Sequence, residues 1–151
     1  MKLSPLQLKH YYYNHLQLES INSEQAFEQM QESPYWVPIA NKIQLSITVG
    51  EPENSDPEAE YVFVISASFS YDEKDFPYKF RAALEGVFVC EKQPEPVANF
   101  QQRLVVNATS MLYSAVREQL LTLSTRQKHG PLMLPTLDFR VLQRASADKN
   151  A

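Results

Sequence analysis

The stretch "EYVFVISASFSYDEKDFPYKFRAALEGVFVCE", residues 60–91, determines the fold. In its first part large apolar side chains recur at every second position from Tyr61 to Phe69. The second part repeats this alternation from Phe76 to Leu84, against charged residues on the other parity. A period of two is typical of a strand with one buried face. The short "DEKD" between the two runs predicts a hairpin turn, and therefore an antiparallel pair of strands.

Two further runs extend this sheet toward the N-terminus. "NKIQLSITVG" alternates Ile43, Leu45, Ile47 and Val49 with polar residues, which predicts a third half-buried strand. "LQLKHYYYNHLQLES" is less regular, but its apolar or aromatic residues Leu6, Leu8, Tyr12, Leu16 and Leu18 share one parity. We therefore expect a long first strand. The acidic, proline-containing "EPENSDPEAE" predicts a solvated loop between the second and third strands.

The segment between the first two strands, "NSEQAFEQMQESPYWVP", predicts a short helix and then an aromatic pair. Asn22 or Ser23 suits the N-cap of this helix, and Pro34 ends it. Tyr35 and Trp36 follow in a loop bounded by prolines. A loop aromatic pair is a common binding device, although packing in the core is the alternative.

The run "RLVVNATSMLYSAVREQLLTLSTRQ", residues 103–127, predicts the main helix. At about 100° per residue its apolar side chains spread over roughly 200° of the helical circumference. An apolar stripe of about 100° is enough to dock a helix on one sheet. The tail could cover part of the surplus, but a second subunit is the economical partner for it. The candidate interface residues are Leu104, Ala108, Met111 and Ala115. Four antiparallel strands and a long C-terminal helix packed on one face give an α+β fold, predicted to form one domain over residues 1–151.

Composition narrows the functional class. The formal net charge is −4, and Lys and Arg form no cluster, which argues against nucleic acid or an anionic membrane as partner. No signal-peptide core and no apolar run of about 18 residues is present, so we expect a cytosolic protein. Cys90 is the single cysteine, which excludes an intramolecular disulfide and a cysteine-based metal cluster.

Motifs for catalysis or cofactor binding are missing from the sequence. Three glycines in the whole chain exclude a Walker A loop and a dinucleotide fingerprint. His10 and His15 lie on one predicted strand at odd separation, so their side chains are expected to face opposite ways and not to share a metal. We therefore expect no catalytic residue, no metal site and no cofactor.

The segment after the main helix, "HGPLMLPTLDF" at 129–139, combines two prolines with many large apolar groups. Together with the end of the helix, "TSMLYSAVREQLLTLSTRQKHGPLMLPTLDF" resembles the SecB family of export chaperones. Upstream, "EGVFV" in the fourth strand and Trp36 also resemble family positions. The resemblance implies a homotetramer built as a dimer of dimers. It also implies ATP-independent binding of unfolded polypeptides in grooves lined by apolar and aromatic groups.

By this resemblance, client-binding residues lie in two segments. The loop supplies Tyr35, Trp36 and Val37, and the tail supplies Leu132, Leu134, Leu137 and Phe139. The tail would then be a proline-stiffened strip that loses little entropy on ordering. For Leu132 and Leu134, packing under the sheet or against the helix is the better explanation.

One position departs from the family. Where export chaperones carry an acid on the sheet face that docks the secretion motor ATPase, this sequence has Arg81. This reversal of charge argues against motor docking. SecB-like proteins also serve toxin–antitoxin systems, and the sequence does not separate such a dedicated role from general export. A small-ligand or lipid carrier and a purely structural homo-oligomer are the alternatives outside the family.

Overall fold

The computed structural model describes residues 1–21, 31–32, 34–52 and 59–142. Its elements follow in chain order: β1 (Leu6–Ser20), β2 (Gln31–Glu32), β3 (Tyr35–Trp36), η2 (Ala40–Lys42), β4 (Gln44–Gly50), β5 (Glu60–Tyr71), β6 (Tyr78–Glu91) and α1 (Val97–Ser124). The four predicted long strands are thus confirmed. The short helix predicted after Asn22 lies outside the described residues.

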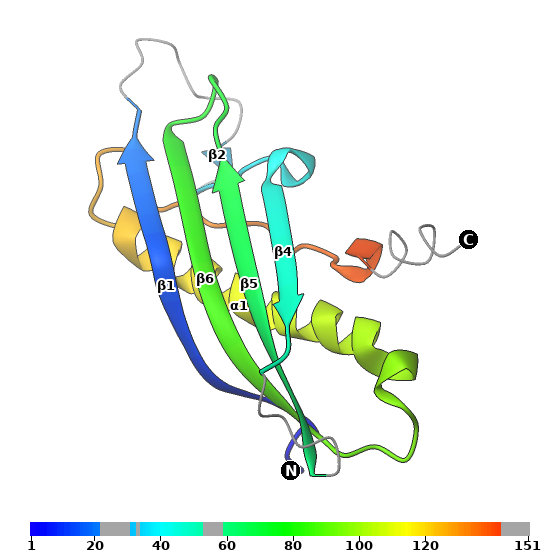
Figure 1. Cartoon of the computed structure of the whole chain (residues 1–151). Helices are drawn as coiled ribbons and strands as arrows, with labels where there is room; N and C mark the ends of the chain where they lie inside the picture. Colours follow the sequence, from blue (N-terminus) through cyan, green and yellow to red (C-terminus); the bar gives the residue numbers. More distant parts are fainter. Residues whose placement is uncertain (22–30, 33, 53–58, 143–151) are drawn as a thin grey trace.

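β1, β6, β5 and β4 form one antiparallel sheet in that order, with β1 and β4 at its edges (Figure 1). The helix α1 and the chain that follows it run behind this sheet in Figure 1 and cover one face. On this inner face Phe63, Ile65 and Phe69 of β5 are buried. The residues between them, such as Ser66 and Ser68, lie on the outer face and stay half-buried. This is the alternation that the sequence predicts for a sheet covered on one side.

β1 contains two register shifts, which change the faces of its central residues. The first lies between Leu8 and His10, and the second between Tyr13 and His15. Each shift inserts one residue and inverts the alternation. Tyr12 therefore lies opposite Glu85 on the outer face, and its predicted inward orientation was wrong.

The second shift also corrects the histidine prediction. His10 pairs with Val87 and His15 with Ala83, and both partners belong to the outer face. The two imidazoles therefore share a face and do not point in opposite directions. Four residue pairs along the strand still separate them, which at about 3.4 Å per residue is far beyond a shared metal.

The helix begins six residues before its predicted start and ends three residues before its predicted end. Its first turn contains Val97 and Phe100, which precede the run that the sequence predicted as helical. Pro96 at the N-cap position provides no side-chain hydrogen bond, so the usual sequence signal for a helix start is absent. The buried residues follow the i, i+4 row and two neighbours (Phe100, Leu104, Ala108, Thr109, Leu112, Tyr113, Val116, Leu120 and Ser124). Such a row turns slowly around the helix, so α1 crosses the sheet obliquely.

Candidate functional site

The chain after α1 runs back across the inner face as an extended strap, residues 131–139 (Figure 1). It pairs with β3, the short strand that Tyr35 and Trp36 form in place of the predicted loop, through a parallel bridge between Trp36 and Leu132. The Trp36 N–H donates to the Pro131 carbonyl at 2.9 Å, and the Met133 N–H donates to the Trp36 carbonyl at 2.9 Å. The resemblance predicted that these two segments act together, and the structure brings them together.

Trp36 itself is a support of this arrangement. Its side chain is 8% exposed, and its ring packs edge-on against Phe76 at 6.4 Å between centroids. The indole N–H donates to the His129 carbonyl at 2.7 Å. An indole buried with its N–H satisfied contributes to stability and offers little surface to a ligand. Its neighbours Tyr35 and Val37 are half-buried and remain accessible.

The strap alternates between buried and accessible side chains. Leu132 and Leu134 are fully buried in the core, as the packing explanation expected. Pro131, Met133 and Pro135 between and beside them are half-buried. The proline residues thus sit where the strap borders solvent.

Side chains of the scaffold hold the strap backbone. The Leu132 N–H donates to the Ser124 hydroxyl at 2.8 Å, and the Tyr113 hydroxyl donates to the Pro135 carbonyl. Burial raises the pKa of the Tyr113 phenol well above its ordinary value, despite the opposing effect of nearby Arg117. The phenol is therefore a permanent donor at neutral pH.

Phe139 locates the end of the strap against the β4 edge of the sheet. Its ring packs on Tyr113 at 5.3 Å and on Phe69 at 6.4 Å between centroids, and it is buried. Phe69 lies directly opposite Leu45 of β4. The turn at residues 139–142 consequently lies beside the inner face of β4, as Figure 1 also shows.

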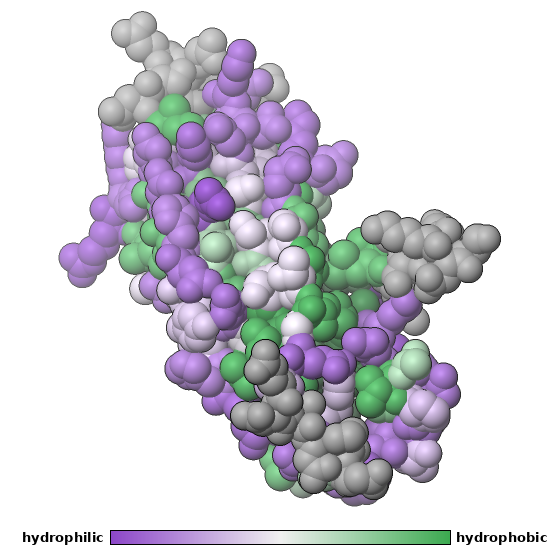
Figure 2. Space-filling model, viewed as in Figure 1, coloured by the Kyte–Doolittle hydropathy of each residue, from purple (hydrophilic) through white to green (hydrophobic). Residues whose placement is uncertain are grey.

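Along this edge the inner face is not fully covered. Leu45 and Ile47 are half-buried, and Val49 is 42% exposed. In the strap and the turn after it, Leu137 is half-buried and Val141 is 58% exposed. Figure 2 shows apolar surface along the sheet edge that β4 forms, toward the turn at residues 139–142. We call these five residues the β4 margin. The alternation of Leu45, Ile47 and Val49 predicted a strand, but it did not indicate that this strand lies at the edge of the sheet.

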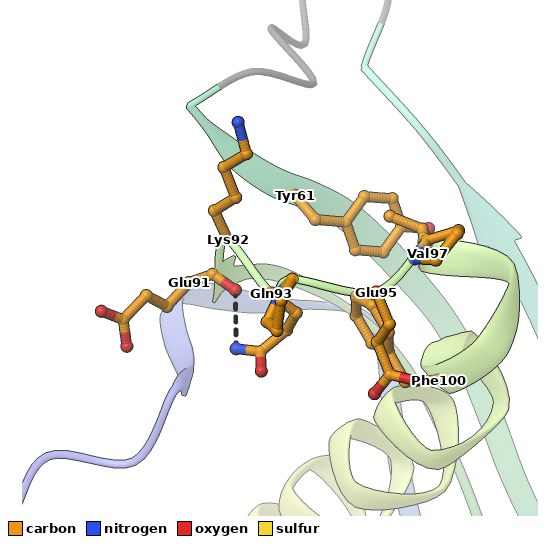
Figure 3. A pocket seen from close by; sticks show the side chains of 9 residues that line it. Tyr61, Glu91, Lys92, Gln93, Glu95, Val97 and Phe100 are labelled. Carbon is orange, nitrogen blue, oxygen red and sulfur yellow. Dashed lines mark hydrogen bonds between the residues drawn. The ribbon is translucent and has the colours of Figure 1, made fainter.

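A separate pocket of about 320 Å³ lies where β6 leads into α1 (Figure 3). Tyr61, Val97 and Phe100 give it an apolar wall, and the proline-containing loop 92–96 forms its rim. This volume is at the lower end of the range for small-ligand pockets. No pattern in the sequence indicated this pocket, because its walls come from three elements.

Two polar side chains that line the pocket, Tyr61 and Gln93, have hydrogen-bond partners within the chain. The Tyr61 hydroxyl donates to Glu51 Oε1 at 2.9 Å and accepts from Gln101 Nε2 at 3.1 Å. Burial first, and then the Glu51 carboxylate, raise the pKa of Tyr61 to about 12. Gln93 Nε2 donates to the Glu91 carbonyl at 3.0 Å, as the dashed line in Figure 3 shows. These groups therefore form a structural network.

The remaining candidate groups have structural surroundings. Cys90 is buried, and burial raises the pKa of its thiol, which disfavours the reactive thiolate. Among residues 1–21, 31–32, 34–52 and 59–142, no three His, Cys, Asp or Glu side chains gather as metal ligands would. Within the same ranges no helix is both long and apolar enough to cross a membrane.

The predicted interface residues of α1 fall into two groups. Leu104 and Ala108 are buried in the core of their own chain. Met111 and Ala115 are half-buried and retain surface for another contact. Part of the wide apolar arc is thus covered by the chain's own sheet and strap, because the buried row turns around the helix.

On the outer face, Arg81 is exposed, as its predicted place on the open side of the sheet requires. The nearest acid along β6 on this face, Glu85, accepts from the Tyr12 hydroxyl and from Asn14 Nδ2, the latter at 3.2 Å. The carboxylate is therefore engaged within its own sheet.

Comparisons with known proteins agree with this architecture. The sequence matches the family described as "Preprotein translocase subunit SecB" over residues 2–150. The chain therefore belongs to the SecB family. No curated protein matches it.

Solved structures similar to the chain include the following two. A protein of unknown function from Streptococcus agalactiae has a TM-score of 0.56 and 16% identity, over 83% of this chain and 92% of that one. A SecB-like chaperone from Mycobacterium tuberculosis, in complex with a ChAD peptide from the HigA1 antitoxin, has a TM-score of 0.43 and 14% identity. That match covers 87% of this chain and 90% of the other. At such identities the first likeness shows the fold alone.

Proposed function

We propose that this protein is an ATP-independent chaperone, a holdase that binds unfolded or unstable polypeptides at the β4 margin and beside the strap. Membership of the SecB family supports a chaperone role. The observation that carries the proposal is the uncovered apolar surface where β4 and the strap converge, with Val49 and Val141 both strongly exposed. Contiguous apolar surface beside a polar rim marks an interaction site.

The burial of individual residues defines their proposed roles. Tyr35 and Val37 keep accessible surface, as does Leu137 of the β4 margin. These residues would contact the client together with the rest of the margin. Trp36, Leu132, Leu134 and Phe139 are buried and would hold the groove in shape. Alanine at Trp36 or Phe139 should therefore reduce stability before it reports on client binding.

Apolar burial explains the mode of binding. Each anchoring side chain contributes roughly 1.5–3 kcal/mol, so tight binding needs several anchors spread along one client chain. Because apolar burial is non-directional, recognition tolerates many sequences and requires no ATP. The two prolines of the strap reduce the entropy that the free chain loses on ordering.

The charge at Arg81 bears on the client. We propose that the chain binds the secretion motor ATPase weakly or not at all, since the exposed guanidinium replaces an acid of the docking face. This favours a dedicated client, such as an unstable antitoxin, over general export. A homotetramer built through Met111 and Ala115 would multiply the grooves.

Light scattering tests the chaperone role. Chemically denatured citrate synthase is diluted into buffer with and without the protein, and we expect aggregation to be suppressed near subunit stoichiometry without ATP. The double variant Leu137→Ala and Val141→Ala should lose most of this effect. Leu123→Ala, at an exposed leucine of α1 outside the β4 margin, is the matched control and should still suppress aggregation. Full aggregation in the presence of the wild-type protein would exclude the proposed function.

A further inference from the structure

The edge strand β4 is supported mainly from one side. Among the residues that the structure describes, β5 is the one strand with which it pairs. The principal contacts of α1 with the sheet are with β1, β5 and β6, so the helix covers β4 least. Leu45 and Ile47 of β4 are accordingly half-buried, whereas Ile65 and Phe69 of β5 are buried. Elements with few packed contacts open most readily, so the end of β4 needs a further contact to stay in place.

The hydroxyl group of Tyr61, at the start of β5, makes such a contact. It donates a hydrogen bond to Glu51 Oε1 at 2.9 Å and accepts one from Gln101 Nε2 at 3.1 Å. Glu51 directly follows β4, and Gln101 lies in the first turns of α1. One oxygen atom thus joins the end of the edge strand to the helix. We call these three residues the Tyr61 bridge.

The bridge lies next to the β4 margin. Glu51 comes two residues after Val49, so the alternation of a strand places both side chains on the same face. This is the inner face, because Val49 lies opposite the buried Ile65. The bridge therefore occupies the inner-face position directly beyond the row of Leu45, Ile47 and Val49.

The ring of Tyr61 is itself held in place. It stacks on Phe63 at 5.2 Å between centroids, and Phe63 stacks on Phe88 at 5.4 Å. Both phenylalanines are buried, and Figure 3 shows the Tyr61 ring beside the start of α1 at Val97. A hydroxyl group on a fixed ring can orient the two longer side chains that it joins. Because its acceptor Glu51 is a carboxylate, this hydrogen bond is of the stronger, charge-assisted kind.

We propose that Tyr61 is a positioning residue for client binding, because its hydroxyl group fixes the end of β4 relative to α1 and so preforms the β4 margin beside Val49. This inference rests on the proposed chaperone function. A surface that is ordered before the client arrives loses less entropy when it binds. If the end of β4 is in place in only a fraction of the molecules, the apparent affinity falls by that fraction.

The test measures client affinity with one hydroxyl group removed. The probe is α-lactalbumin that is reduced and alkylated so that it stays unfolded, labelled with fluorescein and followed by fluorescence anisotropy. Tyr61→Phe keeps the ring and its stacking but removes the bridge. We expect the dissociation constant to rise about three- to tenfold, the factor that one hydrogen bond of typical strength contributes.

Tyr12→Phe is the matched control. It also removes a phenol that donates to a glutamate, Glu85, but this pair lies on the outer face of the sheet. We expect the dissociation constant of this variant to equal that of the wild type. If Tyr12→Phe weakened binding by the same factor as Tyr61→Phe, the effect would be one of general stability and the proposal would be wrong.

Substitutions of Glu51 test the other end of the bridge. Glu51→Ala removes the acceptor and should weaken binding as Tyr61→Phe does. Glu51→Gln keeps an oxygen acceptor at the same place and should restore most of the affinity. Loss of affinity in Glu51→Gln equal to that in Glu51→Ala would assign the effect to the charge and overturn the bridge. These two variants decide the question if Tyr61→Phe fails to fold by circular dichroism.

Hydrogen exchange shows whether the strand end moves. In Tyr61→Phe we expect faster exchange of the amides at the end of β4 and unchanged exchange in β1. Unchanged exchange at the end of β4 would overturn the proposal.

The outcomes separate this proposal from the chaperone function. A wild-type protein that does not bind the unfolded α-lactalbumin would overturn the chaperone function. Wild-type binding that persists with equal affinity in Tyr61→Phe would overturn the positioning role and leave the chaperone function intact.

Discussion

Three buried side chains share one task, which is to donate hydrogen bonds to the backbone around the strap. The Trp36 indole donates to the His129 carbonyl, the Tyr78 hydroxyl to that of Gly130, and the Tyr113 hydroxyl to that of Pro135. A chain segment with prolines cannot satisfy its neighbours through a regular ladder, so its carbonyl groups need other donors. Aromatic residues with polar tips supply these donors while they fill the core.

Replacing Tyr113 tests this role at one atom. Tyr113→Phe keeps the ring contacts with Phe69 and Phe139 but leaves the Pro135 carbonyl without its donor. We expect the free energy of unfolding to fall by about 1–3 kcal/mol, measured by urea denaturation. Tyr11→Phe, at an exposed tyrosine, is the control and should change it little. A Tyr113→Phe protein as stable as wild type would contradict this account of the strap.

The raised pKa of Tyr61 predicts a loss of stability in alkali. Its ordinary value is 10.0 and burial raises the folded pKa to about 12, so the folded state keeps the phenol proton longer than the unfolded chain. The resulting stabilisation is fully present below about pH 10 and is lost between about pH 10 and pH 12. Urea unfolding across this range should show the decline, and Tyr61→Phe should reduce its slope. An unchanged slope in the variant would assign the decline to other groups.

The resemblance predicted which two segments meet, but the exposure of their residues could not be predicted from the sequence. Tyr35 to Val37 and the tail after Gly130 do meet, as the resemblance implied. Yet Trp36 and Phe139 are buried, because each fills the gap that its own segment closes. Whether an aromatic side chain is buried in the core or borders a groove depends on the residues that pack against it. Those residues come from distant parts of the chain, so a local stretch of sequence does not predict the burial.

At the scale of elements, periodicity identified the strands because one face of the sheet is buried and the other is open. β5 shows this most clearly, with alternate residues buried from Phe63 to Tyr71. The register shifts of β1 were not predictable, since inserted residues such as Lys9 differ in no way from ordinary outward-facing residues. The start of α1 was missed because Pro96 replaces a capping side chain.

The closest approach of helix to sheet predicts a sensitive position at Gly86. A methyl group there would lie 2.8 Å from Leu112 Cδ2 and 2.8 Å from Phe88 Cε2. Gly86→Ala should therefore push α1 away from β6 and lower the free energy of unfolding by about 1–3 kcal/mol. Gly50→Ala is the control, because nothing lies within 4 Å of the added carbon. Urea denaturation of both variants provides the measurement, and equal stabilities would show that the helix adjusts without cost.

At the scale of the whole molecule, the covered and open surfaces form a consistent arrangement. One sheet face carries the helix and strap, and the other is open and bears the exposed Arg81. The edge strands β1 and β4 lie at opposite sides of this sheet. The partly uncovered residues Leu45, Ile47 and Val49 therefore lie along one side of the sheet.

The remaining surface of α1 predicts self-assembly. Met111 and Ala115 are half-buried in the single chain, although Leu104 and Ala108 on the same predicted stripe are buried in its own core. We expect a homotetramer in sedimentation at micromolar concentration, with a dimer on dilution. Met111→Glu or Ala115→Glu should reduce the mass while circular dichroism stays unchanged, because an unpaired charge is disfavoured in an interface but tolerated at a partly exposed position.

Leu104→Glu distinguishes the two kinds of contact on this helix. It places a charge inside the subunit's own core, so we expect the subunit to unfold and circular dichroism to change. A stable wild-type monomer would remove the prediction of assembly. Assembly that survives both Met111→Glu and Ala115→Glu would move the interface elsewhere, and the β1 edge and the outer face of the sheet would be the next surfaces to test.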